Sequence, residues 1–268
     1  MNRALLVGIN EYPSSPLEGC VNDVTDMANF LVSRCGFALS EIRLLTDKRA
    51  TRNGIVDRVN WLLRKVKKGD RILFHYSGHG AQLPTRNPSG EVDGLDEVIC
   101  PVDFDWTDEH TIRDKDFVKL FKNVPEGVEF IWISDSCHSG DLSRAIPPKG
   151  KKEKRLIAPA DIQWRRQTAL CEKSIEPLTM VRAGSLLQGA LISGCRSDQT
   201  SADAYFNKKP NGALTYFLLK ELQKTNGLKA PLAVIIKNVR KSLKGNKFSQ
   251  VPQLEGSSVV LQKPFMVI

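Results

Sequence analysis

The stretch RILFHYSGHG (residues 71–80) is an apolar run that stops at small residues and then presents one histidine, His79. The stretch IWISDSCHSG (131–140) repeats this arrangement and presents one cysteine, Cys137. Apolar runs of this length are typical of buried strands in a parallel sheet. Active residues of such sheets gather beyond the carboxyl ends of the strands. We therefore expect His79 and Cys137 to lie within reach of each other if their strands are neighbours.

Apolar segments alternate with amphipathic segments along the rest of the chain. Strands are expected at 3–9, 41–45, 71–76, 128–134 and 188–193, with an edge strand at 258–261. Helices are expected from a cap at Asn22 or Asp23 to about Cys35, after a cap at Thr51, and at 117–121, 212–225 and 231–243. This alternation predicts an α/β fold with a mainly parallel central sheet flanked by helices on both faces.

A single domain over residues 1–268 accounts for this pattern. Residues 1–142 carry the histidine and the cysteine, and residues 187–268 complete the same sheet. Between them, 141–186 shows little periodicity and no convincing strand, so we expect a long, exposed, basic linker over 143–186.

Composition and charge exclude several classes of protein. The chain is 41% hydrophobic and 26% charged, which is ordinary for a soluble globular protein. No apolar window approaches the ~18 residues of a membrane span, and the start is too short and polar for a signal peptide. We therefore expect a cytoplasmic protein without membrane contact. Its six cysteines should be reduced thiols, and no spacing suggests a structural zinc site.

The net charge of +9 comes from local basic runs at 150–155, 164–167 and 237–247. No aromatic residues interleave with the first run, and no familiar nucleic-acid motif is present. We interpret the first run as a flexible, solvated segment and do not expect nucleic-acid binding. For the oligomeric state, a monomer is favoured.

The residues around the two motifs suit nucleophilic catalysis. A cysteine peptidase needs a thiolate, an imidazole that takes the thiol proton, and amide donors for the oxyanion. Glycines on both sides of His79 allow close approach of backbone to a substrate. The amides of Gly80 and Cys137 are the candidate oxyanion donors. Taken alone, each reactive residue would more often be structural, because buried cysteines are common; the matched positions favour catalysis.

The motifs YSGHG (76–80) and DSCHSG (135–140) closely resemble the histidine and cysteine motifs of metacaspases and their prokaryotic caspase-like relatives. The resemblance extends to the segments LLVGINEYP (5–13), LEGCVNDV (17–24), DGLDEVICPVD (93–103), LISGCRSDQTSADA (191–204) and GALTYFLLKEL (212–222). It implies a caspase-like fold and an endopeptidase that works through a thioester acyl-enzyme. Cys137 would be the nucleophile and His79 the general base, then acid. The alternative is a caspase-fold regulatory or binding protein without substantial protease activity.

The resemblance also implies a specificity pocket made by Asp23, Asp135 and Ser77. Two carboxylates in a narrow pocket favour a cation before the cut bond, with Arg ahead of Lys because its guanidinium can pair bidentately. Protein or peptide substrates with Arg or Lys before the cut would follow. Taken alone, Asp23 could equally be a helix cap.

Many metacaspases require calcium, and no other cofactor is needed for the chemistry. The resemblance implies the candidate ligands Asp93, Asp96, Glu97 and Asp114. Two positions depart from the family pattern, because they hold the cations Lys115 and Arg144, which would repel the ion. The alternative is that these acids pair with internal basic residues.

A protease specific for Arg and Lys would find a substrate in its own basic linker. We expect self-cleavage after Lys151, Lys152, Lys154 or Arg155, with Arg165 or Arg166 as a second region. Both fragments should stay associated through the core. The rival interpretation is a basic patch for an acidic partner, which predicts no cleavage and a salt-sensitive complex.

Overall fold

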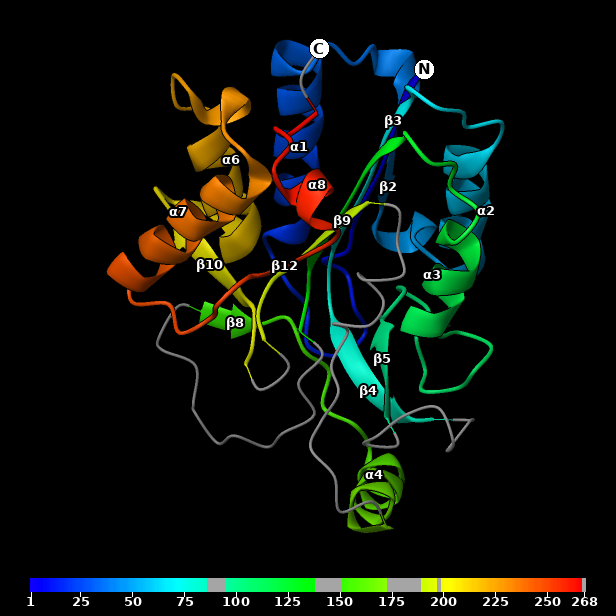
Figure 1. Ribbon diagram of the computed structural model, residues 1–268. Helices are drawn as coiled ribbons and strands as arrows, with labels where there is room; N and C mark the ends of the chain where they lie inside the picture. The colour runs from blue at the N-terminus through cyan, green and yellow to red at the C-terminus, as the bar shows by residue number, and fades with distance from the viewer. Residues whose placement is uncertain (86–94, 138–150, 173–188, 197–198, 267–268) are drawn as a thin grey trace.

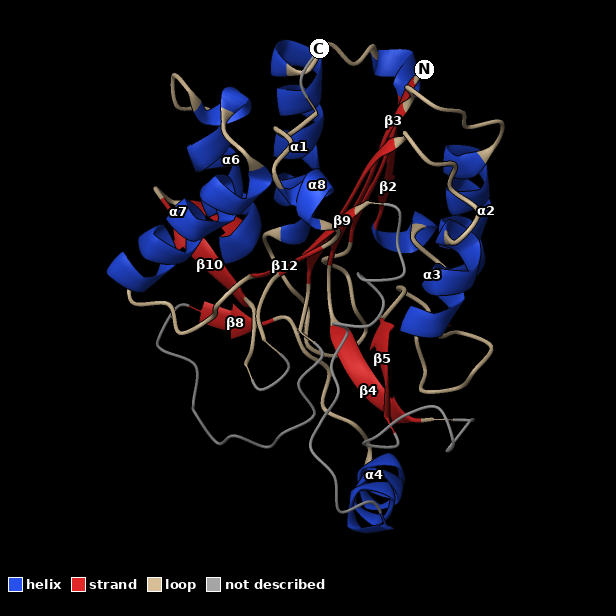
Figure 2. Cartoon of the chain, viewed as in Figure 1, coloured by secondary structure: helices blue, strands red, loops and turns tan. Residues whose placement is uncertain are grey.

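The computed structural model describes residues 1–85, 95–137, 151–172, 189–196 and 199–266. Its centre is a six-stranded sheet with the order β12-β9-β7-β3-β1-β2. All neighbouring pairs are parallel except β9 and β12, which are antiparallel. Figures 1 and 2 show this sheet between two layers of helices. The prediction of an α/β fold with a mainly parallel sheet is thus confirmed.

The strands of the central sheet are β1 (Asn2–Gly8), β2 (Ile42–Thr46), β3 (Arg71–Ser77), β7 (Glu129–Asp135), β9 (Ala190–Ser193) and β12 (Gln253–Glu255). Two smaller antiparallel sheets contain β4 (Gly80–Pro84), β5 (Leu95–Ile99) and β6 (Ile112–Arg113), and β8 (Lys151–Glu153), β10 (Ala202–Phe206) and β11 (Lys209–Gly212). The helices are α1 (Cys20–Arg34), α2 (Arg52–Leu63), α3 (Asp114–Phe121), α4 (Ala160–Glu172), α6 (Ala213–Leu222), α7 (Leu232–Gly245) and α8 (Ser258–Leu261).

Strict alternation of side chains along the central strands produces two hydrophobic cores. In β1, Leu5 and Val7 face the core under α2 and α3, and Ala4 and Leu6 face the core under α1, α6 and α7. Successive strand residues point to opposite faces, so a strand covered on both sides is apolar throughout. In Figure 1 these two helical layers lie on either side of the sheet.

The carboxyl ends of β3 and β7 lie side by side, because Ser77 is paired with Asp135. His79 follows β3 and Cys137 follows β7, so both motifs lie at the carboxyl ends of the central strands. The strands β4 and β5 lie beyond these strand ends (Figure 2). Among the described residues, no helix is long and apolar enough to cross a bilayer.

Three expectations were wrong in detail. Residues 258–261 form helix α8, in which the Ser257 hydroxyl accepts a bond from the Val260 amide, and the edge strand is β12. The helix α1 begins at Cys20, so Asp23 lies inside it and is not its cap. The described part of the basic linker holds β8 and α4, and its Lys154 is fully buried.

Candidate functional site

The backbone of Lys154 lies between the two motifs. Its carbonyl oxygen accepts hydrogen bonds from the amides of Gly80 (3.1 Å) and Cys137 (3.2 Å). These are the two amides expected to hold an oxyanion. Its own amide donates to the Ser201 carbonyl (3.0 Å), which continues the antiparallel pairing of β8 with β10. Residues 151–154 therefore lie across the strand ends as an extended strand, with one carbonyl held by two amide donors.

The side chain of Lys154 fills an acidic pocket below that carbonyl. Its ammonium Nζ lies 3.1 Å from Asp23 Oδ2 and 3.2 Å from Asp135 Oδ1, and donates to Ser77 Oγ (2.8 Å). The lysine and both aspartates are fully buried. The structure thus brings together the three residues predicted for the specificity pocket and seats a cation of the chain itself among them. A buried charge of this kind is tolerated only when it is paired and hydrogen-bonded.

Four residues that the sequence analysis missed complete this pocket. Thr215 donates to Asp135 Oδ2 through its amide (2.9 Å) and its hydroxyl (2.8 Å), and Ser201 Oγ donates to Asp135 Oδ1 (2.8 Å). Asn211 Nδ2 and the Gly212 amide donate to Asp23 Oδ1 (3.0 and 2.9 Å). A Cβ at Gly212 would stand 2.1 Å from Lys154 Nζ, so only glycine leaves room for the cation.

Burial and hydrogen bonding act differently on the two pocket carboxyls. Burial alone would raise the pKa of Asp135, but the Lys154 ammonium and the Thr215 donors outweigh it, so its pKa lies below the usual value. Thr215 is in the first turn of α6, where the helix dipole also favours an anion. Burial raises the pKa of Asp23 to about 6 despite the same ammonium. Asp135 is therefore the more firmly charged partner of the pocket.

His79 is held in place by contacts on both sides of its ring. Its Nε2 bonds to the Ser15 carbonyl (2.6 Å), which can only accept, so Nε2 carries the proton and Nδ1 is the free base. Burial lowers the pKa of His79 to about 4, against the opposing effect of the Ser15 and Lys154 carbonyls. The Tyr12 ring packs on the imidazole at 4.5 Å, and its hydroxyl accepts the His79 amide (3.0 Å). A neutral imidazole that can accept a proton is the result.

A glycine at position 78 leaves room for two tyrosine hydroxyls. A Cβ there would lie 2.5 Å from the Tyr12 hydroxyl and 2.7 Å from the Tyr76 hydroxyl. Both hydroxyls bond to the backbone of His79: the Tyr76 hydroxyl donates to its carbonyl (2.7 Å), and the Tyr12 hydroxyl accepts its amide. Gly78 therefore permits these two tyrosines to fix the loop that carries His79.

The thiol of Cys137 is fully buried and rests on the backbone of Ser201. Sγ donates to the Ser201 carbonyl (3.2 Å) and accepts a bond from the Ser201 amide. Nearby, a bond to the Cys137 thiol and burial raise the pKa of Cys195 well above its usual value, so Cys195 stays a neutral thiol.

Two of the residues expected to bind calcium, Asp96 and Asp114, already have other partners. Asp96 is 2% exposed and already has two cationic partners, Arg113 Nη1 at 2.5 Å from Oδ2 and Lys115 Nζ at 2.6 Å from Oδ1. The Asp114 carboxylate accepts the Lys115 amide (2.8 Å). Among the described residues, no group of three or more metal-ligating side chains converges. Of the other expected positions, Glu97 is buried in β5, while Asp93 and Arg144 lie outside the described residues.

The expected cleavage positions occupy different environments. Lys151 and Lys152 belong to β8, and Lys154 is buried, while Arg155 follows it with an ion pair to Glu153 (3.1 Å). Arg165 and Arg166 lie in α4. Of these positions, Lys154 is the one whose carbonyl and side chain both sit in the site.

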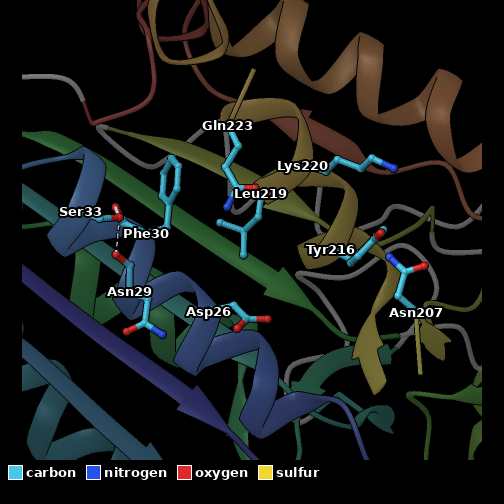
Figure 3. Close-up of a pocket in the computed structure, with 9 residues that line it drawn as sticks. All are labelled: Asp26, Asn29, Phe30, Ser33, Asn207, Tyr216, Leu219, Lys220 and Gln223. Atoms are coloured by element: carbon cyan, nitrogen blue, oxygen red, sulfur yellow. Dashed lines mark hydrogen bonds between the residues drawn. The ribbon is translucent and has the colours of Figure 1, made fainter. Parts of the chain in front are cut away.

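A second hollow, of about 490 Å³, is separate from this site (Figure 3). It lies between α1 and α6, with Asn207 at one end, and none of the predicted site residues lines it. Its carboxylate, Asp26, is already neutralised by Lys209 (2.6 Å). We therefore place the candidate site at the strand ends, around Lys154.

Comparison with known proteins assigns the chain to a family. Residues 2–145 match the model of the metacaspase peptidase C14 domain. The chain is 34% identical to Metacaspase-1 of Scheffersomyces stipitis over 95% of its length and 70% of that protein. It is 31% identical to Metacaspase-1B of Aspergillus oryzae over 95% of its length and 67% of that protein.

Two solved structures share the fold. Protein GSU0716 from Geobacter sulfurreducens superposes with a TM-score of 0.71 at 26% identity, covering 100% of this chain and 98% of that one. Caspase-1 from Spodoptera frugiperda superposes with a TM-score of 0.60 at 11% identity, covering 95% and 86%. The second likeness concerns the fold alone.

Proposed function

Because the chain belongs to the metacaspase family of cysteine peptidases, we propose that it hydrolyses peptide bonds after Lys or Arg and that Lys154–Arg155 is its own cleavage site. One observation carries the proposal: Lys154 lies in the site as a substrate would. Its ammonium contacts two buried carboxylates while its carbonyl oxygen accepts two amides. A guanidinium could pair with both carboxylates through its planar fork, which supports Arg at the same position.

The chemistry follows from the contacts around that carbonyl. The S–H bond of Cys137 turns from the Ser201 carbonyl to Nδ1 of His79, which takes the proton as sulfur attacks the carbonyl carbon of residue 154. The amides of Gly80 and Cys137 hold the oxyanion that forms. Imidazolium then gives its proton to the leaving nitrogen of residue 155, and a thioester remains. Water, activated by the same imidazole, hydrolyses the thioester and restores the thiol.

Turnover of short fluorogenic peptides tests this function. We expect wild type to release the fluorophore from Lys-ended and Arg-ended peptides, and to leave Asp-ended peptides intact because the pocket is acidic. The measurement is kcat/KM for the three peptides under one set of conditions. If wild type hydrolysed none of them, the alternative of a regulatory caspase-fold protein would replace this proposal.

We further propose that the activity does not require calcium. Arg113 and Lys115 supply the positive charge at Asp96, and a dication approaching them would be repelled. Peptide turnover should therefore agree within about twofold between excess EGTA and millimolar Ca²⁺, since the Asp96 carboxylate is already paired with two cations. Activation of tenfold or more by Ca²⁺, reversed by EGTA, would contradict the proposal.

A further inference from the structure

Upstream of Lys154, the strand β8 makes side-chain contacts of its own. It pairs antiparallel with β10, with Lys152 opposite Asp203 and Lys151 opposite Ala204. Backbone pairing of this kind fixes an extended peptide regardless of sequence, while the side-chain contacts provide selectivity. The side chains of β8 therefore show which groups the neighbouring surface accepts two and three residues before Lys154.

Lys152, two residues before Lys154, meets an acidic subsite. Its Nζ lies 2.8 Å from Glu18 Oε1 and donates to the Pro16 carbonyl (3.1 Å). The other oxygen of Glu18 accepts a short bond from the Tyr205 hydroxyl, and the Glu18 amide donates to Asp203 Oδ2 (2.7 Å). The Lys152 contact, followed by the Tyr205 contact, lowers the pKa of Glu18. Glu18 is thus held by Tyr205 and Asp203 of β10 while it binds Lys152.

A second carboxylate adds to the negative charge of this subsite. Asp203 is 3% exposed, and its Oδ1 has no hydrogen-bond partner among the described residues. It lines a groove of about 320 Å³ together with Glu18, Lys152 and Tyr205. Within the part of the chain that the structure describes, the only cations in its lining, Lys151 and Lys152, belong to β8 itself, so the surface that receives β8 contributes two carboxylates and favours a cationic side chain.

Lys151, three residues before Lys154, meets a different surface. Its ammonium lies 3.7 Å from the centroid of the Phe248 ring and donates to the Lys247 carbonyl (3.3 Å). An ammonium over an aromatic face is attracted by the ring quadrupole. Glu153, which lies between Lys152 and Lys154 in the sequence, pairs with Arg155 (3.1 Å).

We propose, on the basis of the proposed function, that the protease selects substrates with a second basic residue two positions before the cleaved Lys or Arg, through Glu18 oriented by Tyr205. Phe248 adds a weaker preference for a cation one position further upstream. The substrate class is therefore a multibasic extended segment, not any exposed Lys or Arg.

Peptides that vary at one position test the acidic subsite. The series is Lys-X-Glu-Lys with a C-terminal aminocoumarin and X as Lys, Ala or Glu, assayed with the full chain. Because Glu18 and Lys152 are 39% and 45% exposed, their pair is partly screened. We expect kcat/KM with X as Lys to exceed that with X as Ala about threefold to fivefold, and that with X as Glu by about tenfold.

Substitutions at the subsite provide the matched comparison. Glu18→Gln should reduce the Lys-to-Ala ratio below about twofold, and Glu18→Lys should invert the order of X as Lys and X as Glu. Tyr205→Phe should give an intermediate ratio, and Glu126→Gln, an exposed residue at the opposite edge of the sheet, should leave it unchanged. Ratios between peptides on one variant cancel any effect of the substitution on the seating of β8.

The outcomes separate this inference from the function on which it rests. If wild type cleaved no peptide of the series, the proposed function would fail. If all three peptides were cleaved after Lys with equal kcat/KM, or if Glu18→Lys kept the order of wild type, the inference alone would be overturned.

Discussion

Wild-type chain incubated at neutral pH should convert to two fragments, one ending at Lys154 and one beginning at Arg155, while Cys137→Ala stays intact. The bond between them already lies against both amide donors, so the reaction is intramolecular and needs little reorganisation. Removing the nucleophile should slow the cut by at least about a thousandfold, since the catalytic residues act as one unit. Fragment masses measured over time check the expectation.

Two further variants make this result specific. Lys154→Gln keeps a polar side chain, shorter by one atom, and removes its charge, so cleavage at this bond should stop. Cys35→Ala removes another buried thiol, at the far end of α1, and should cut like wild type. Cleavage after Lys151, Lys152, Arg165 or Arg166 but not after Lys154 would show that the observed position of Lys154 in the site does not lead to cleavage. Fragments that also form in Cys137→Ala would indicate a contaminating protease.

Asp135→Asn should lower kcat/KM for Lys-ended and Arg-ended peptides by about a hundredfold or more. The substitution keeps the shape of the side chain and leaves a cation in the pocket without its more firmly charged partner, and a broken buried pair costs about 3–5 kcal/mol. The measurement is kcat/KM on the same peptides, with thermal unfolding to check that the fold is kept. Turnover should fall while the unfolding transition remains cooperative.

Asp26→Asn is the matched control for the pocket. Asp26 is also an aspartate of α1, one turn beyond Asp23, but it is partly exposed and binds Lys209 and the Asn211 amide group (3.1 Å), not the Lys154 ammonium. Its loss should change kcat/KM less than about twofold, as expected for an exposed pair. Equal losses in Asp26→Asn and Asp135→Asn, or efficient cleavage after Asp by wild type, would contradict the assignment of the acidic pocket.

The fold was predictable because its strands are buried on both faces. Stretches such as 71–77 and 129–135 are nearly continuous apolar runs, and in a parallel sheet their ends must lie at one edge. That rule was enough to expect His79 and Cys137 near each other if their strands were neighbours, and β3 and β7 are neighbours. The strand predicted at 258–261 was wrong because Ser-Val-Val-Leu fits a short strand or a capped helical turn equally well. The Ser257 cap favours the helical turn.

The occupied pocket was not predictable from local patterns. Nothing in the run 150–155 distinguishes a buried lysine from its exposed neighbours, because the burial of Lys154 depends on Asp23 and Asp135, which are distant in sequence. The donors Ser201, Asn211 and Thr215 likewise reach the carboxylates through the packing of β10, β11 and α6. Only the glycine before a helix, Gly212, gave a local signal, and it is equally typical of an ordinary helix start.

The same strand that presents Lys154 has a kinetic consequence once the bond is cut. Hydrolysis leaves Lys154 with a new carboxylate, yet β8 keeps its pairing with β10 and remains joined to Cys137 through residues 138–150. The cut end is then a tethered product whose effective concentration at the site is about millimolar, as for short linkers. An added peptide must compete with it, so the apparent KM exceeds the true one. Dilution of the enzyme should not lower the apparent KM, because the competing end at Lys154 is covalently joined to the chain.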